Sequence, residues 1–231
     1  NIRSSGGRRE GCVGFGKWTM KQIEVSVKIT NAHNLSAYRR WAPIYDATVN
    51  HLFTPGRRRA LEVLSLQASE NVLIVGVGTG ADLPYLPTGA TATGIDLSPD
   101  MLAKARLKLD LCPASVTLIE GDAQELHVPE NSFDAAILNL ILSVVPDGRA
   151  CLKSALRAVK PGGRLVVFDK FQTENKKITP IRRFMNYFST RLGTDITRRF
   201  SDMLDNCPCK VIQEEPSLLG GVYRIVLLRK E

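Results

Sequence analysis

Residues 72–80, Val-Leu-Ile-Val-Gly-Val-Gly-Thr-Gly, carry the pattern that decides the fold. An apolar run leads directly into alternating glycines, which is typical of a buried parallel strand that ends in a tight turn. Glycine suits this turn because it adopts backbone angles that other residues resist and leaves no side chain against a ligand. Such a strand and turn, followed by a short helix, form a corner that binds nucleotide-type ligands.

Length and composition indicate an ordinary globular protein with one sizeable core. The chain has 231 residues, of which 44% are hydrophobic and 23% are charged. The net charge of +8 permits an anionic partner, either a phospholipid surface or a nucleic acid, without requiring one. Five cysteines without a metal-like spacing favour a reducing compartment, and the sequence suggests no metal site.

No stretch of the sequence has the character of a membrane span. The longest apolar stretch, residues 135–146, is about twelve residues long, whereas a spanning helix needs about twenty. The sequence also lacks an apolar core of a secretion signal near its start. We therefore expect a cytoplasmic protein, which could also lie peripherally at the inner membrane surface.

The region before the glycine turn divides into two segments. Residues 1–19 are rich in glycine and arginine without periodicity, which predicts a disordered leader or a stretch foreign to the native chain. Residues 20–66 are predicted to form an N-terminal lid of helices. A helix from Asn34 or Ser36 is divided by Pro43 into two short pieces, and a basic amphipathic helix follows over residues 55–66. Tyr38 and Tyr45 fall at helical spacing; they either pack against the main domain or border the ligand as part of the lid.

Residues 67–231 are predicted to form the catalytic domain. Strands and helices alternate through its first part, so a doubly wound, mostly parallel α/β sheet is expected. The strands predicted there cover residues 71–75, 92–96, 116–120, 133–140 and 165–168. A helix capped by Ser98 and another over residues 147–159 connect them.

The last part of the chain departs from this alternation. Two helices are predicted over residues 180–192 and 194–204, and two closing strands over residues 210–214 and 223–229. The first of these helices places aromatic and aliphatic residues beside arginines. It is either an interfacial helix for anionic lipid or an ordinary helix over the substrate pocket.

One carboxylate matches the spacing of a ribose ligand. Asp96 ends the second predicted strand, twenty residues after Gly76. An acidic residue at that place can accept hydrogen bonds from ribose hydroxyls.

Four motifs, in this order and spacing, resemble the class I S-adenosylmethionine-dependent methyltransferases. They are Gly76-Val77-Gly78-Thr79-Gly80, Gly94-Ile95-Asp96-Leu97-Ser98, Gly121-Asp122-Ala123 and Lys160-Pro161-Gly162-Gly163-Arg164-Leu165. The resemblance implies a Rossmann-like, seven-stranded sheet whose last hairpin supplies an antiparallel strand. It also implies S-adenosyl-L-methionine as the cofactor.

The resemblance assigns cofactor contacts residue by residue. The residues concerned are Gly76, Gly78, Gly80, Asp96, Asp122, Ala123, Asn139 and Leu140. The glycines would lie against the methionine and ribose, Asp96 would hold the ribose hydroxyls, and Asp122 would accept from the adenine amino group. The backbone of Ala123 would contact the ring, and the last two residues would flank the methionine.

One position departs from the family pattern. The family usually has an acidic residue two positions before the first glycine, where this chain has Ile74. That carboxylate helps to hold the amino end of the cofactor, so its absence leaves room for a compensating group elsewhere.

A looser resemblance concerns the methyl acceptor. Residues 38–46 and 221–229 are similar to segments of soluble bacterial phosphatidylethanolamine N-methyltransferases, while quinone-pathway C-methyltransferases share a related tyrosine–aspartate element. We therefore predict N-methylation of a phospholipid amine such as phosphatidylethanolamine. The alternative acceptors are a soluble small molecule, a thiol or a quinone precursor.

Methyl transfer from a sulfonium is an in-line displacement that requires alignment and exclusion of water rather than a catalytic triad. An amine nucleophile must lose a proton, and Tyr38, Tyr45 and Asp169 are candidates for orientation or proton acceptance. Each has a plainer interpretation, as a packed tyrosine or a solvated carboxylate at a strand end.

Other functional classes account for fewer of the motifs. A nicotinamide-dependent dehydrogenase would explain the glycine turn and Asp96, but not residues 121–123 or the Pro-Gly-Gly turn. A catalytically inactive cofactor-binding protein is favoured only by Ile74. A nucleic-acid amine methyltransferase would need an Asn/Asp-Pro-Pro-aromatic cluster where this chain has Asn139-Leu140-Ile141-Leu142, so no nucleic-acid partner is expected. The sequence leaves the oligomeric state open.

Overall fold

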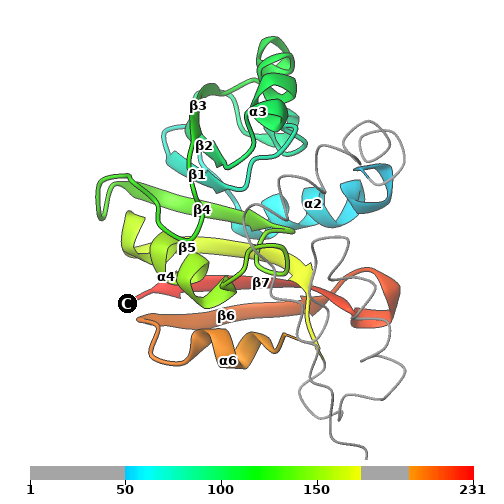
Figure 1. Cartoon of the computed structure of the whole chain (residues 1–231), viewed down its shortest axis with the longest axis vertical. Coiled ribbons are helices and arrows are strands. Elements are labelled where there is room, and N and C mark those ends of the chain that lie inside the picture. The colour runs from blue at the N-terminus through cyan, green and yellow to red at the C-terminus, as the bar shows by residue number, and fades with distance from the viewer. Residues whose placement is uncertain (1–49, 173–197) are drawn as a thin grey trace, which may run out of the picture.

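The computed structural model describes residues 50–172 and 198–231 (Figure 1). These residues contain a seven-stranded sheet with the strand order β3-β2-β1-β4-β5-β7-β6. The strands are β1 (Asn71–Val75), β2 (Thr91–Asp96), β3 (Ser115–Glu120), β4 (Phe133–Asn139), β5 (Val159–Lys170), β6 (Cys209–Pro216) and β7 (Tyr223–Lys230). The helices are α2 (Asn50–Leu64), α3 (Pro99–Arg106), α4 (Gly148–Ala158) and α6 (Phe200–Leu204). The described residues also contain short 3-10 helices, which are η2 (Leu83–Tyr85), η3 (Leu109–Leu111) and η4 (Leu219–Gly221).

The topology confirms the predicted fold class. Strands β1 to β5 pair in parallel, and β7 lies antiparallel between β5 and β6. The strand order reverses between β1 and β4, which lie side by side although β2 and β3 separate them in sequence. The carboxyl ends of strands at such a switch point are where ligands bind in open α/β sheets.

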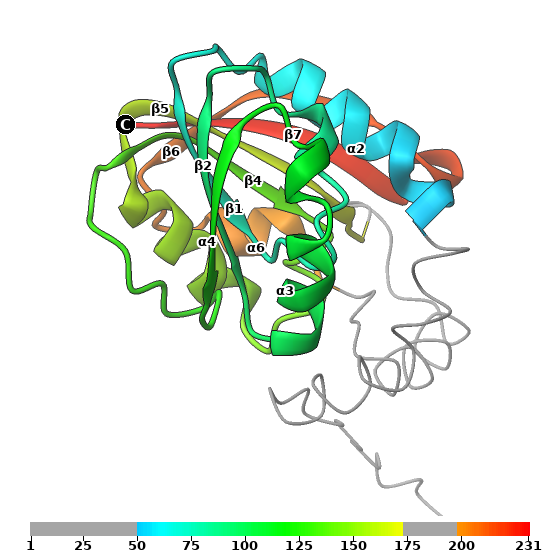
Figure 2. The same ribbon diagram turned by 90° about the horizontal axis from the view of Figure 1, so that it is seen from above.

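Helices cover both faces of the sheet. Helix α2 lies on one side, and α4 and α6 lie on the other (Figure 2). Strands β1 and β4, together with β5 from Leu165 onward, lie between these layers and are buried on both faces, which explains their continuous apolar runs.

Helix α2 covers Asn50–Leu64, so the prediction of a helix over residues 55–66 was wrong at both ends. Tertiary packing explains the earlier start. The buried Phe53 ring lies 5.1 Å from the Tyr223 ring and 6.3 Å from the Phe168 ring, measured between centroids. Burial of Phe53 in this aromatic cluster stabilises the turn of helix that precedes Pro55. The proline removes only one backbone N–H donor from the helix, so this packing can compensate for its loss.

The last helix of the described residues is also shorter than predicted. Residues 198 and 199 are not helical, and α6 covers only Phe200–Leu204. The guanidinium of Arg198 donates to the carbonyls of Leu142 and Pro146, which holds the chain extended before the helix. The expected helix over residues 180–192 and the aromatic segment around Tyr38 lie outside the described residues.

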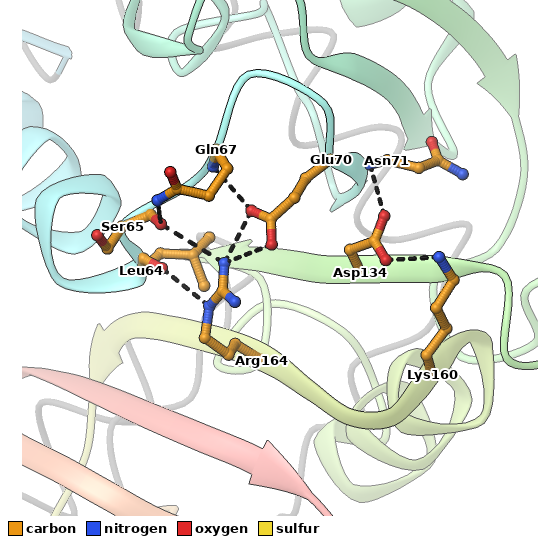
Figure 3. A network of polar contacts seen from close by, with 8 residues as sticks. All are labelled: Leu64, Ser65, Gln67, Glu70, Asn71, Asp134, Lys160 and Arg164. Carbon is orange, nitrogen blue, oxygen red and sulfur yellow. Dashed lines mark hydrogen bonds and ion pairs between the residues drawn. The ribbon is translucent and has the colours of Figure 1, made fainter.

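A polar network joins α2, β1 and β5 at the amino ends of the strands (Figure 3). Arg164 donates to both carboxylate oxygens of Glu70 at 2.8 Å and to the carbonyl of Leu64 at 3.1 Å. Beside it, Asp134 accepts from the backbone N–H of Asn71. The network fixes the edge of the sheet opposite the carboxyl ends of the strands.

None of the helices in residues 50–172 and 198–231 is both long enough and apolar enough to cross a bilayer. The same residues contain no cluster of three or more potential metal-ligating side chains.

Candidate cofactor site

The glycine turn leaves an open cradle at the end of β1. Gly76, Gly78 and Gly80 have φ angles of +72°, +55° and +74°, which favour glycine over residues with a side chain. A Cβ at Gly76 would lie 2.6 Å from the Ile141 side chain, and one at Gly80 would lie 2.8 Å from Leu83. At Gly78 a Cβ would meet nothing within 4 Å, so this residue faces open space.

Asp96 lies directly beside this cradle at the end of β2. One carboxylate oxygen accepts the Gly78 N–H at 2.8 Å, and the other accepts the Ser98 N–H at 3.0 Å. A carboxylate has about four acceptor positions, so both oxygens retain capacity for the hydroxyls of a ribose. Burial raises the pKa of Asp96, while these N–H groups oppose that rise by stabilising the charged form.

The segment after β3 lies next to Asp96 because the Gly121 N–H donates to the Asp96 carbonyl at 3.0 Å. The Asp122 carboxylate accepts from the backbone and side-chain N–H groups of Gln124, and Ala123 is buried. The structure therefore brings both residues to the predicted edge. The contact between Asp122 and adenine stays a prediction.

The end of β4 completes the site. Leu140 has a φ of +60°, which is unusual for a residue with a side chain, and its N–H donates to the Phe168 carbonyl at 2.7 Å. The buried Asn139 side chain donates through Nδ2 to Asp82 at 3.0 Å, while its buried Oδ1 has no hydrogen-bond partner among the described residues.

Sequence reasoning missed two charged residues at this edge. The buried Asp82 accepts from Arg57 of α2 at 2.8 Å, and the Arg57 side chain is only 11% exposed. The sequence did contain a signal for Asp82. Ile74 stands where the family usually has a carboxylate, and Asp82 is an acidic residue only two positions after the last glycine of the turn. No local pattern pointed to Arg57, since it precedes Asp82 by 25 residues.

Asp169 lies at the end of β5 and is completely buried. The interpretation of it as a solvated carboxylate was therefore wrong, because the packing of the β4 and β5 ends encloses it. Its oxygens accept the N–H groups of Ser143 at 2.9 Å and Lys170 at 2.8 Å. Burial raises the pKa of Asp169. Its role in orientation or proton acceptance stays a prediction, and Tyr38 and Tyr45 lie outside the described residues.

These features fit S-adenosylmethionine. The space at Gly78, the acceptors on Asp96 and the unpaired oxygen of Asn139 lie at the carboxyl edge of neighbouring strands. Gly78 leaves space for the ligand against the backbone, Asp96 offers acceptors for ribose hydroxyls, and Asn139 Oδ1 offers a buried acceptor for an N–H group of the ligand.

Comparisons with known proteins agree with this geometry. Residues 73–167 match the family model described as a methyltransferase domain. The chain is 29% identical over 197 residues to a phosphatidylethanolamine N-methyltransferase from Cereibacter sphaeroides, covering 84% of this chain and 96% of that protein. It is 40% identical over 141 residues to a demethylmenaquinone methyltransferase from Tropheryma whipplei, covering 59% of this chain and 57% of the relative. The chain thus spans nearly all of the first relative and little more than half of the second.

Solved structures share the fold. An S-adenosylmethionine-dependent methyltransferase from Thermotoga maritima aligns with a TM-score of 0.65 at 20% identity, covering 86% of this chain and all of that one. The cyclase SpnF aligns with a TM-score of 0.62 at 19% identity, covering 77% and 80%. At these identities the likeness establishes the fold alone.

The fold, the site and the domain match define an S-adenosylmethionine-dependent methyltransferase. The protein is an enzyme of this class, with the Rossmann-like seven-stranded sheet and with S-adenosylmethionine as its cofactor. The bound cofactor supplies a methyl group activated on a sulfonium. The residues at this edge of the sheet would orient the cofactor and shield the transfer from water.

Proposed function

We propose that the protein methylates the amine of a phospholipid such as phosphatidylethanolamine. The observation that carries this proposal is the extent of the similarity to the phosphatidylethanolamine N-methyltransferase, which covers 84% of this chain and 96% of that protein. Acceptor recognition needs segments outside the cofactor cradle, so similarity along nearly the whole chain favours a shared acceptor more than a shorter match does.

Loss of the amine proton is the step in which the residues of the chain would act. Tyr38 and Tyr45 would orient the amine or accept its proton, and tyrosine faces would favour a cationic sulfonium or methylated ammonium. Asp169 already accepts two backbone N–H groups in complete burial. This arrangement supports a positioning role for Asp169, which would hold the loop after β4 against the end of β5.

The proposed encounter with substrate takes place at an anionic membrane surface facing the cytoplasm. The net charge of +8 supports electrostatic attraction to such a surface. Arg182 and Arg183, which lie outside the described residues, flank the apolar sequence that would face the lipid.

Methylation of a quinone precursor is the second candidate. It is favoured by the higher identity, 40%, of the shorter match to a demethylmenaquinone methyltransferase. A thiol or another small molecule is the remaining alternative acceptor.

A methyl-transfer assay with labelled S-adenosylmethionine distinguishes these acceptors. The protein would be incubated in parallel with phosphatidylethanolamine vesicles, vesicles carrying demethylmenaquinone, free ethanolamine and a small thiol. We expect label in N-methylated phosphatidylethanolamine. Label in the quinone would instead establish the second candidate, and label only in a water-soluble acceptor would refute lipid methylation.

A further inference from the structure

A series of buried hydrogen bonds connects α2, the segment after the glycine turn and β4. Arg57 donates to one carboxylate oxygen of Asp82 at 2.8 Å, and Asn139 Nδ2 donates to the other at 3.0 Å. Asp82 is 1% exposed and Asn139 is 4% exposed. An ion pair removed from water to this degree costs free energy unless the geometry and further hydrogen bonds compensate.

This series of hydrogen bonds ends in an acceptor that no described residue satisfies. Within residues 50–172 and 198–231, the buried Asn139 Oδ1 has no hydrogen-bond partner. The orientation of the amide is fixed by Asp82, because a carboxylate only accepts and must therefore face the Nδ2 group. A buried acceptor without a donor is unfavourable, which points to a ligand that brings an N–H group.

This acceptor lies beside the glycine turn, at the carboxyl edge of the sheet. Asp82 follows Gly80 by two residues, and Asn139 precedes the loop whose Ile141 side chain lies against Gly76. The residue expected to hold the amino end, two positions before Gly76, is Ile74. It is 1% exposed within the apolar core and pairs with Gly94 on one side and Ile137 on the other. The hydrocarbon side chain of Ile74 has no polar atom, so it cannot form a hydrogen bond with the amino group of the cofactor.

We propose that Asp82 and Asn139 replace the missing carboxylate and hold the amino group of the methionine half of S-adenosylmethionine. Asn139 Oδ1 accepts one of its N–H groups, and the Asp82 carboxylate attracts the positive charge. Arg57 is a positioning residue that fixes Asp82 and balances its charge. The Arg57–Asp82 ion pair would thereby face the methionine end of the cofactor, which carries both an ammonium and a carboxylate group. This assignment concerns the cofactor and is independent of the methyl acceptor.

The test compares two ligands that differ at this end. S-adenosylhomocysteine carries the amino acid, whereas 5′-methylthioadenosine lacks both its amino and carboxylate groups. Isothermal titration calorimetry on Asp82→Asn and Asn139→Leu should show S-adenosylhomocysteine binding weakened by about tenfold to hundredfold. The affinity for 5′-methylthioadenosine should stay within about twofold of that of the unmodified protein.

Glu70→Gln is the matched control. It breaks another carboxylate–guanidinium pair, with Arg164 at 2.8 Å, at the opposite edge of the sheet (Figure 3). It should lower the thermal unfolding midpoint and leave both affinities unchanged. This control separates a loss of ligand contact from a general loss of stability.

Two results would overturn the proposal. One is unchanged S-adenosylhomocysteine affinity in Asn139→Leu, the variant that deletes the unpaired oxygen and retains the Arg57–Asp82 pair. The other is an equal loss of affinity for both ligands in a variant whose circular dichroism shows a native fold. If Asp82→Asn does not fold, Asn139→Leu decides the question by the same two measurements.

Discussion

At the scale of single residues, Asp96 links the parts of the cofactor site. Its side chain accepts N–H groups from the glycine turn and from the start of α3, and its carbonyl accepts from Gly121. One residue thus joins the ends of β1, β2 and β3 while retaining acceptors for a ligand.

Replacing Asp96 by alanine should weaken S-adenosylmethionine binding by about tenfold to hundredfold. The ribose hydroxyls lose their acceptor, and such a loss in a buried site costs about 1–3 kcal/mol of binding free energy. Calorimetric titration measures this change, and a thermal melt confirms that the variant is folded. Affinity equal to that of the unmodified protein would show that the ribose lies elsewhere.

Cofactor affinity should also depend on the protonation of Asp96. Burial raises the pKa of this carboxyl from its ordinary value. The charged form accepts ribose hydroxyls, so binding favours deprotonation, and affinity should fall as the pH drops through the raised pKa. Calorimetry over a series from neutral to about pH 4 measures this slope, because an ordinary aspartate titrates near 3.9. In Asp96→Asn the slope should be smaller, and an equal slope would assign it to another group.

At the scale of secondary-structure elements, α2 precedes the first strand of the sheet and contributes Arg57 to the site. Its docking depends on a close approach at Gly56, where a Cβ would lie 2.3 Å from Cζ of Phe168. The Phe168 ring is fully buried between Phe53 and Tyr223, so it has no free space into which to turn.

Gly56→Ala should therefore destabilise the protein although alanine favours helices. Overpacking typically costs about 1–3 kcal/mol, and the helix preference of alanine over glycine returns about 1 kcal/mol. We expect a net loss of up to about 2 kcal/mol in the free energy of unfolding, measured by chemical denaturation. Adding Phe168→Leu should shrink the effect of Gly56→Ala, because the shorter side chain vacates the space. Equal effects in both backgrounds would contradict this contact.

At the scale of the whole molecule, the proposed lipid substrate requires a basic protein to meet an anionic surface. The net charge of +8 supplies a long-range attraction that salt screens. Each basic residue near such a surface contributes about 1 kcal/mol.

The fraction of protein bound to anionic vesicles should accordingly fall as salt is added. Replacing Arg182 and Arg183 together by alanine should weaken binding further, by roughly thirtyfold at low salt if each contributes about 1 kcal/mol. S-adenosylhomocysteine affinity should not change in this variant. Vesicle flotation measures the bound fraction, and absence of binding at low salt would refute membrane presentation.

Local sequence patterns were enough to predict the class of fold and to place Asp96 beside the glycine turn, while the predicted cofactor contacts stay predictions. Apolar runs, the glycines after β1 and Asp96 after β2 are local features, and the alternation of strands and helices restricts how they assemble. The order and spacing of the four motifs then identified the cofactor, which the domain match confirms. The division into leader, lid and catalytic domain stays a prediction.

Which residues far apart in sequence come into contact became evident only in the folded molecule. Arg57 and Asp82 are 25 residues apart, and Asp82 and Asn139 are 57 apart. The early start of α2, the burial of Asp169 and the close approach at Gly56 likewise appear only in the assembled molecule. Local periodicity shows which face of an element is apolar, but the docking of a helix on a particular strand depends on the shapes of all the side chains between them.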